Sequence, residues 1–215
     1  PAALHPPGRR ARAALDQARE VLAGAVGVRP DELSLHPDAQ TALTVGLDGL
    51  RHARRRVGTR VVASAVERSV VLLSPGTDQP VPVDHEGRVD VSAFAASLDN
   101  PGDGPPAAAV LQSANGEVGT RQPVAAVDAL CRTAGIPLLL DATASLGRDP
   151  AAHPTGAGSV IVADAATFGG PPLGLLAVRT GTRWGLPGPR REAEHRRALA
   201  APWVPLALTA AQAWV

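Results

Sequence analysis

Apolar residues recur along the chain in segments whose spacing changes between a helical and an extended pattern. In the helical segments they lie three or four positions apart, as Leu15, Ala18 and Leu22 do. This spacing predicts helices, some of only one or two turns, at 10–25, 39–50, 68–73, 92–98 and 123–134. Short apolar runs predict strands at 32–36, 60–65, 107–111, 136–140, 159–162 and 175–178.

Strands that alternate with helices predict an α/β fold with a mostly parallel central sheet flanked by helices. Residues 81–91 alternate in polarity about Glu86-Gly87 and predict a hairpin. Asp84, His85 and Glu86 could indicate a metal site, but side chains that alternate along a strand favour a hairpin tip without metal. The Pro/Gly-rich loop at 99–106 is too short for an interdomain linker. We therefore expect one domain over residues 1–215, ending in a tail that begins as a charged helix and becomes apolar.

The charge balance argues against nucleic acid as a partner. The 215 residues carry 21 basic and 20 acidic side chains, for a net charge of +1, and aromatic residues make up only 2%. All the basic side chains are arginine, because the sequence contains no lysine. The run Arg54-Arg55-Arg56 could bind phosphate, although a solvated helix end is the commoner role of such a run.

The cysteine content and the apolar segments address the cellular setting. Cys131 is the single cysteine, which fits a reduced cytoplasmic location. It falls in the middle of a predicted helix, where an inert buried thiol is expected. The most apolar stretch, 199–215, is short for a membrane span and contains Pro202 and Pro205, so we expect burial rather than membrane insertion.

Two residues at predicted strand ends are candidates for a ligand site. Asp141 follows the apolar run IPLLL, and a carboxylate there is costly to bury unless it is paired. It caps a helix or forms a salt bridge, or else it pairs with a protonated ring nitrogen of a cofactor. Asn115 follows the strand at 107–111 and either forms a turn with Gly116 or faces a ligand. Both residues lie at the carboxyl edge of the predicted sheet, where α/β proteins bind ligands.

Four segments, in order along the chain, resemble cysteine desulfurases of the class V aminotransferase group. They are PAALHPPGRRARAALDQAREVLAGAVG, ANGEVGTRQPV, LCRTAGIPLLLDATASLG and FGGPPLGLLAVR. The resemblance implies the large domain of a fold-type-I pyridoxal phosphate transferase, without the small C-terminal domain. It also implies that Asp141 matches the carboxylate that holds the pyridine nitrogen, and that Asn115 matches a residue near the cofactor hydroxyl.

The same comparison shows departures at the residues that bind the cofactor. Ala166 stands at the position of the family's Schiff-base lysine, and Arg68 at that of the histidine that stacks on the ring. The phosphate-binding Gly-Ala-Thr is replaced by Asp38, Ala39 and Gln40, which brings a carboxylate to a helix N-terminus where an anion should bind. Asp141, Asn115, Arg68, Ala39 and Gln40 are therefore vestigial candidates for cofactor binding, and no catalytic residue is assigned.

Three hypotheses follow for the function. The first is a pseudoenzyme without covalent cofactor chemistry, structural or regulatory, which pairs with itself or with an active desulfurase-like paralogue, since the family forms dimers with sites at the subunit interface. The second is a protein that binds pyridoxal phosphate or a similar small ligand non-covalently, in an altered reaction or a sensing role. The third is a decaying gene product or one segment of a split protein.

Overall fold

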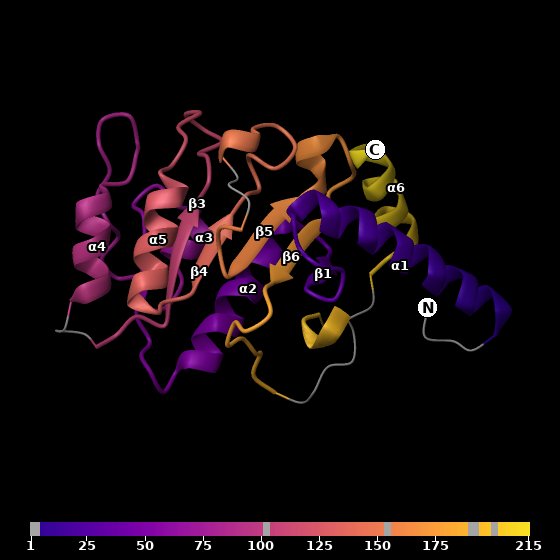
Figure 1. The fold of residues 1–215 in the computed structure, drawn as a ribbon, viewed down its shortest axis with the longest axis horizontal. Helices are drawn as coiled ribbons and strands as arrows, with labels where there is room; N and C mark the ends of the chain where they lie inside the picture. Colours follow the sequence, from indigo (N-terminus) through magenta and orange to yellow (C-terminus); the bar gives the residue numbers. More distant parts are fainter. Residues whose placement is uncertain (1–4, 101–103, 153–155, 189–193, 199–201) are drawn as a thin grey trace.

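The computed structural model is described for residues 5–100, 104–152, 156–188, 194–198 and 202–215. Its strands form one six-stranded sheet in the order β1-β6-β5-β4-β3-β2 (Figure 1). The strands are β1 Leu33–His36, β2 Val61–Ala63, β3 Ala108–Gln112, β4 Leu138–Asp141, β5 Val160–Asp164 and β6 Gly174–Val178. The four strands from β2 to β5 are parallel, whereas β6 runs antiparallel to both β5 and β1. The predicted mostly parallel sheet is confirmed.

Helices cover both faces of the sheet. They are α1 Pro6–Val26, α2 Ala39–Arg54, α3 Ser69–Leu72, α4 Val91–Asp99, α5 Val124–Ala134 and α6 Val204–Trp214, with short 3₁₀ turns η2 Pro150–Ala152, η3 Ala165–Phe168 and η4 Glu194–Arg196. One apolar core joins α1, α4, α5 and α6 to one face of the sheet, and a second joins α2 and α3 to the other. The molecule is therefore a three-layer α/β/α structure, as the helix and strand pattern predicts.

Local chemistry explains where the helices differ from the prediction. Helix α1 begins at Pro6, four residues early, because proline suits the first helical turn and the His5 ring accepts a hydrogen bond from the Gly8 N–H. Helix α2 continues past Leu50 to Arg54, where basic side chains of the last turn complement the helix dipole.

The prediction for the hairpin is confirmed, whereas part of the prediction for the C-terminal tail is wrong. Val83 pairs with Val89 in an antiparallel bridge, and Gly87 has a φ of 76°, so the predicted hairpin is present. The predicted charged helix at the start of the tail is wrong where it is described. Residues 194–196 form only a 3₁₀ turn in which all three have positive φ, and residues 190–193 lie outside the described residues. The apolar part of the tail folds as α6, which packs against α1.

Candidate functional site

Polar residues end neighbouring parallel strands at the carboxyl edge of the sheet. Gln112 ends β3, Asp141 ends β4, and the two are partners in the strand register. Asp164 ends β5, next to β4. This edge is where ligands bind in open parallel sheets, and the fold brings the predicted Asp141 to it.

Asp141 is buried, with 2% of its surface exposed. One carboxylate oxygen, Oδ1, accepts a hydrogen bond of 2.9 Å from the Thr143 N–H. Burial raises the pKa of the Asp141 carboxyl, whereas the hydrogen bonds from Thr143 and the charge of Arg68 lower it. Arg68 lies beside this group, because its Nη1 donates to Thr143 Oγ1 at 3.0 Å.

Glu67 is a second buried carboxyl at the same edge, and sequence reasoning did not single it out. Its Oε1 accepts the Gln112 N–H at 2.9 Å, while Oε2 is buried without a hydrogen-bond partner. Burial raises the pKa of Glu67 to about 8, opposed by the Gln112 N–H and assisted by the negative charge of Asp141. Glu67 therefore carries a proton at neutral pH. The signal for it was a glutamate placed just after the predicted strand at 60–65.

Asn115 forms a turn, the first of the two roles that its sequence predicts. Its Oδ1 accepts hydrogen bonds from the N–H groups of Glu117 and Val118, at 2.8 and 3.1 Å. Its Nδ2 donates to the Val66 carbonyl at 3.4 Å, a long contact that links the loop to the residue before Glu67. The amide oxygen thus stabilises its own loop, and the side chain lies near the Glu67 segment.

The N-terminus of α2 is capped by a carboxylate of its own chain. Asp38 accepts the Thr41 N–H at 2.7 Å and the Thr41 hydroxyl at 2.9 Å. The hydrogen bond from the Thr41 N–H is the main reason that the pKa of Asp38 is lowered. Ala39 is buried and Gln40 is exposed. A bound phosphate would meet a negative charge at this helix end, so Asp38, Ala39 and Gln40 do not form an anion site.

Ala166 lies in η3, directly after β5, and is exposed. Its N–H donates to Asp164 Oδ1 at 3.0 Å, and its methyl group offers no nucleophile. The neighbouring Ala165, at the position of the family's histidine, is buried. The edge therefore holds Asp141, Glu67 and Arg68 together, with no amine at the position where the resemblance requires one.

A cluster of metal ligands and a membrane-spanning helix are both lacking among the described residues. No three histidine, cysteine, aspartate or glutamate side chains gather there closely enough to hold a metal ion. No helix within the described ranges has the length and apolar character needed to cross a membrane. Cys131 is buried in α5, and burial raises the pKa of its thiol to about 12, as expected for an inert residue.

Solved structures share this fold. A NifS-like protein superposes with a TM-score of 0.82 over 99% of this chain and 60% of its own, at 23% sequence identity. DndA from Streptomyces lividans superposes with a TM-score of 0.78 over 98% of this chain and 62% of its own, at 27% identity. The three-layer fold is therefore that of the large domain of a fold-type-I pyridoxal phosphate transferase.

Sequence comparison narrows this class to a family. The chain is 30% identical over 188 residues to the IscS-like cysteine desulfurase of Mycobacterium tuberculosis, covering 82% of this chain and 47% of that protein. It is 30% identical over 210 residues to a cysteine desulfurase of Cereibacter sphaeroides, covering 91% and 52%. No family model matches the chain. The chain belongs to the cysteine desulfurase family and spans about half the length of these relatives.

Proposed function

We propose that this chain is a cysteine-desulfurase-like pseudoenzyme. It forms one large-domain unit over residues 1–215 and works as a structural or regulatory subunit, in the reduced cytoplasmic setting that its single cysteine fits. The observation that carries the proposal is Ala166, exposed at the carboxyl edge where the family has its Schiff-base lysine. No lysine elsewhere in the sequence can form the Schiff base instead, because the 215 residues contain none.

The residues at this edge do not fit covalently bound pyridoxal phosphate. A methyl group stands at the amine position, Asp38 occupies the helix N-terminus where a phosphate would bind, and Arg68 replaces the stacking ring. Asp141 alone retains the chemistry needed to hold a pyridine nitrogen. Because these contacts are lost together, we expect no desulfurase activity from this chain alone.

Association is the second part of the proposal. Exposed apolar side chains lie on the segments that follow the carboxyl ends of β2 and β3, with 83% of Leu73 and 68% of Val118 exposed. The family resemblance places subunit contacts around the cofactor edge, so these side chains support a pairing there. The apolar tail is a weaker argument for a partner than its sequence indicates, because α6 buries Ala207, Ala210 and Ala211 within this chain.

The test is a titration with pyridoxal phosphate, followed by absorbance and by intact mass after borohydride reduction. We expect no reduced adduct at the carboxyl edge of the wild-type chain. Ala166→Lys should also bind poorly, because Asp38 remains, and Ala166→Lys with Asp38→Gly should bind better. A specific adduct on the wild-type chain would overturn the proposal. Light scattering should show a dimer, alone or with an active paralogue; a stable monomer in both cases would overturn the pairing.

Non-covalent binding of pyridoxal phosphate or a similar ligand is the second candidate. The buried, unpartnered Glu67 Oε2 and the nearby Asp141 and Arg68 support it, because they offer a proton donor, an acceptor and a cation at one edge. Saturable binding without a reduced adduct is then expected, weakened at least tenfold by Asp141→Ala. Unchanged binding by a folded Asp141→Ala variant would contradict this candidate.

A further inference from the structure

A second concave site lies at the opposite, amino-terminal end of the parallel strands. It is a cavity of about 530 Å³. Its floor includes Leu138 at the start of β4 and Ser159 just before β5, and its rim includes the loop 179–183 after β6. The cavity is therefore separated from Asp141 by the length of β4, and nothing in the proposed function uses it.

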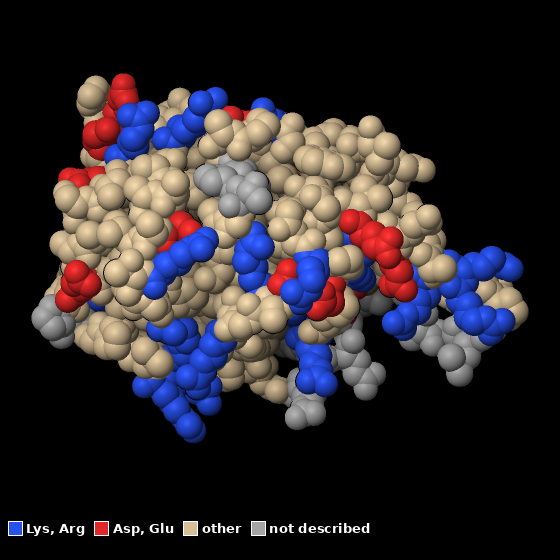
Figure 2. Space-filling view, in the orientation of Figure 1, with Lys and Arg blue, Asp and Glu red and all other residues tan. Residues whose placement is uncertain are grey.

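The lining of this cavity is strongly basic. It contains four arginines, Arg54, Arg132, Arg179 and Arg183, and one acidic residue, Asp128, so its side chains carry a net charge of +3. The whole chain has a net charge of only +1. Figure 2 shows basic side chains gathered at the lower margin of the molecule in this view, where Figure 1 places the C-terminal end of α2.

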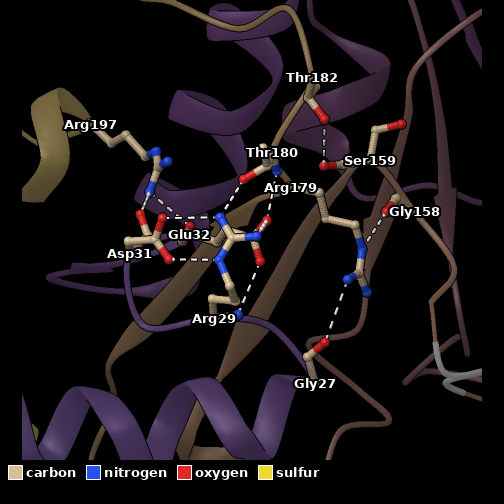
Figure 3. Close-up of polar contacts among 10 residues, drawn as sticks. All are labelled: Gly27, Arg29, Asp31, Glu32, Gly158, Ser159, Arg179, Thr180, Thr182 and Arg197. Atoms are coloured by element: carbon tan, nitrogen blue, oxygen red, sulfur yellow. Dashed lines mark hydrogen bonds and ion pairs between the residues drawn. The ribbon is translucent and has the colours of Figure 1, made fainter.

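Two of the arginines are already used by the fold. Arg132 donates to Asp128 at 2.6 Å and to the Gly156 carbonyl at 2.8 Å. Asp128 also accepts the Gly158 N–H at 2.8 Å, so this one carboxylate is fully engaged within the rim. Arg179 donates to the carbonyls of Gly158 and Gly27 (Figure 3).

The other two arginines, Arg54 and Arg183, line the cavity from separate elements. Arg54 ends α2, and Arg183 lies in the segment after β6. Burial lowers the pKa of Arg54, and the positive charge of Arg183 lowers it further. The Arg54 Nε atom is buried and has no hydrogen-bond partner. Neither guanidinium forms an ion pair with any acidic residue that the structure describes. Like charges that line one cavity repel each other, and an anion bound there relieves that repulsion.

The loop that carries Arg183 is held in place from both sides. Thr182 Oγ1 donates to the Ser159 carbonyl at 3.2 Å, and the Thr180 N–H donates to Glu32 Oε1 at 2.6 Å (Figure 3). Glu32 is in turn held by the Arg29 N–H at 3.0 Å. Because these bonds fix the loop before any ligand arrives, little ordering would be needed for Arg183 to bind an anion.

We propose that this cavity binds a small molecule with two or more linked phosphate groups, held between Arg54 and Arg183. A diphosphate matches the net charge of the lining, and guanidinium groups bind phosphate oxygens in pairs. The concave shape and the scarcity of aromatic residues favour a small ligand over a nucleic acid strand. The sequence alone assigns the run Arg54-Arg55-Arg56 most simply to a solvated helix end. In this proposal Arg54 is the member of the run that binds phosphate.

The test is calorimetric titration of the full chain with inorganic pyrophosphate at low salt. We expect saturable binding that weakens at least tenfold in Arg54→Gln and in Arg183→Gln, and that weakens further as salt is added. Arg55→Gln is the matched control, because Arg55 is exposed, donates to the His52 carbonyl at 2.8 Å and does not line the cavity. Its affinity should equal that of the wild-type chain.

Two outcomes would overturn the proposal. One is pyrophosphate binding that is absent, or that Arg183→Gln leaves unchanged; Arg183 is exposed, so this variant should stay folded, and thermal unfolding checks that it does. The other is tighter binding of a short DNA duplex that pyrophosphate does not displace, which would make the basic surface a nucleic-acid site instead. Pyridoxal phosphate binding is measured separately with the Asp141→Ala variant, so failure here is distinguishable from failure of the proposed function.

Discussion

Among single residues, Glu67 is the one whose pKa folding shifts most clearly. Burial raises its pKa to about 8, whereas the pKa of an unfolded glutamate is about 4.3. Between these two values the folded chain holds a proton that the unfolded chain has lost. The free energy of unfolding therefore falls as pH rises through this window.

Glu67→Gln should remove this pH dependence. The amide oxygen can still accept the Gln112 N–H, so we expect the variant to gain stability relative to wild type between about pH 5 and pH 8, on the order of a few kcal/mol. Urea unfolding at both pH values measures it. Glu86→Gln, at an exposed carboxyl, should follow the wild-type curve. Parallel curves for Glu67→Gln and wild type would contradict a protonated Glu67.

Asp38→Ala tests the helix cap that excludes a phosphate. Removing the acceptor of the Thr41 N–H should lower the free energy of unfolding by about 1 kcal/mol at neutral pH. The lowered pKa of Asp38 means that this contribution is present above the ordinary aspartate pKa and is lost as pH falls through the folded value. Asp48→Ala, which removes a half-buried pair with Arg51 on the surface of α2, should change stability by less than about 0.5 kcal/mol. Equal effects of the two would refute the cap.

Sequence reasoning at this scale located Asp141, Asn115, Asp38 and Ala166 but not Glu67. The first four stand in quoted motifs or at a strand end. The importance of Glu67 depends on its burial against Gln112, which belongs to a strand that is distant in sequence. The shared cavity of Arg54 and Arg183 is hidden for the same reason, since no local pattern shows that two arginines on separate elements line one cavity.

Between elements, a buried ion pair joins α1 to the segment after β6. Arg19 and Glu194 are 8% and 3% exposed, and Glu194 Oε2 also accepts the Leu35 N–H at 2.7 Å. Glu194→Ala would leave Arg19 buried without its partner, so we expect a loss of about 3–5 kcal/mol in urea unfolding. Arg12→Ala, which removes an exposed pair with Asp16, is the control and should cost less than about 1 kcal/mol. A small effect of Glu194→Ala would show that the pair is not formed.

Two glycines should respond in opposite directions to alanine. A Cβ on Gly174, at the start of β6, would lie 2.1 Å from the Asp38 carbonyl oxygen, so Gly174→Ala should cost about 1–3 kcal/mol. A Cβ on Gly24, on the exposed side of α1, meets nothing within 4 Å. Gly24→Ala should therefore stabilise the chain by about 0.5–1 kcal/mol. Thermal unfolding measures both, and a shift of the same sign for the two variants would contradict the close approach of β6 to α2.

Element boundaries follow from the sequence as far as local signals set them. Gly135 ends α5 as predicted, because it adopts a left-handed conformation with a φ of 65°. The strand predicted at 60–65 shortens to β2, because only Val61–Ala63 pair with β3. Its length depends on a neighbour that is remote in sequence. The antiparallel direction of β6 is likewise absent from the hydrophobic pattern, since a buried strand reads the same in either direction.

For the whole molecule, Cys131 provides a probe of global opening. Its side chain is 1% exposed, and burial raises the pKa of its thiol to about 12. We expect a thiol reagent to label it far more slowly than a free cysteine near neutral pH, at a rate that rises with urea in step with unfolding. Rapid labelling of the native chain would show that α5 opens locally. Labelling of Cys131→Ser, the control, should be zero, because the chain has no other cysteine.

The position of β1 affects how the chain can fold while it is being synthesised. Among the strands that the structure describes, β1 is made first, yet it pairs there only with β6, the last of them, with Leu33 opposite Ala177. At about 5–20 residues per second, the ribosome needs roughly 7–30 s to reach that partner. During this time β2 to β5 can assemble in order, whereas the edge of β1 stays open to other chains. A nascent chain stalled before β6 should therefore recruit a chaperone, and one stalled well beyond β6 should release it.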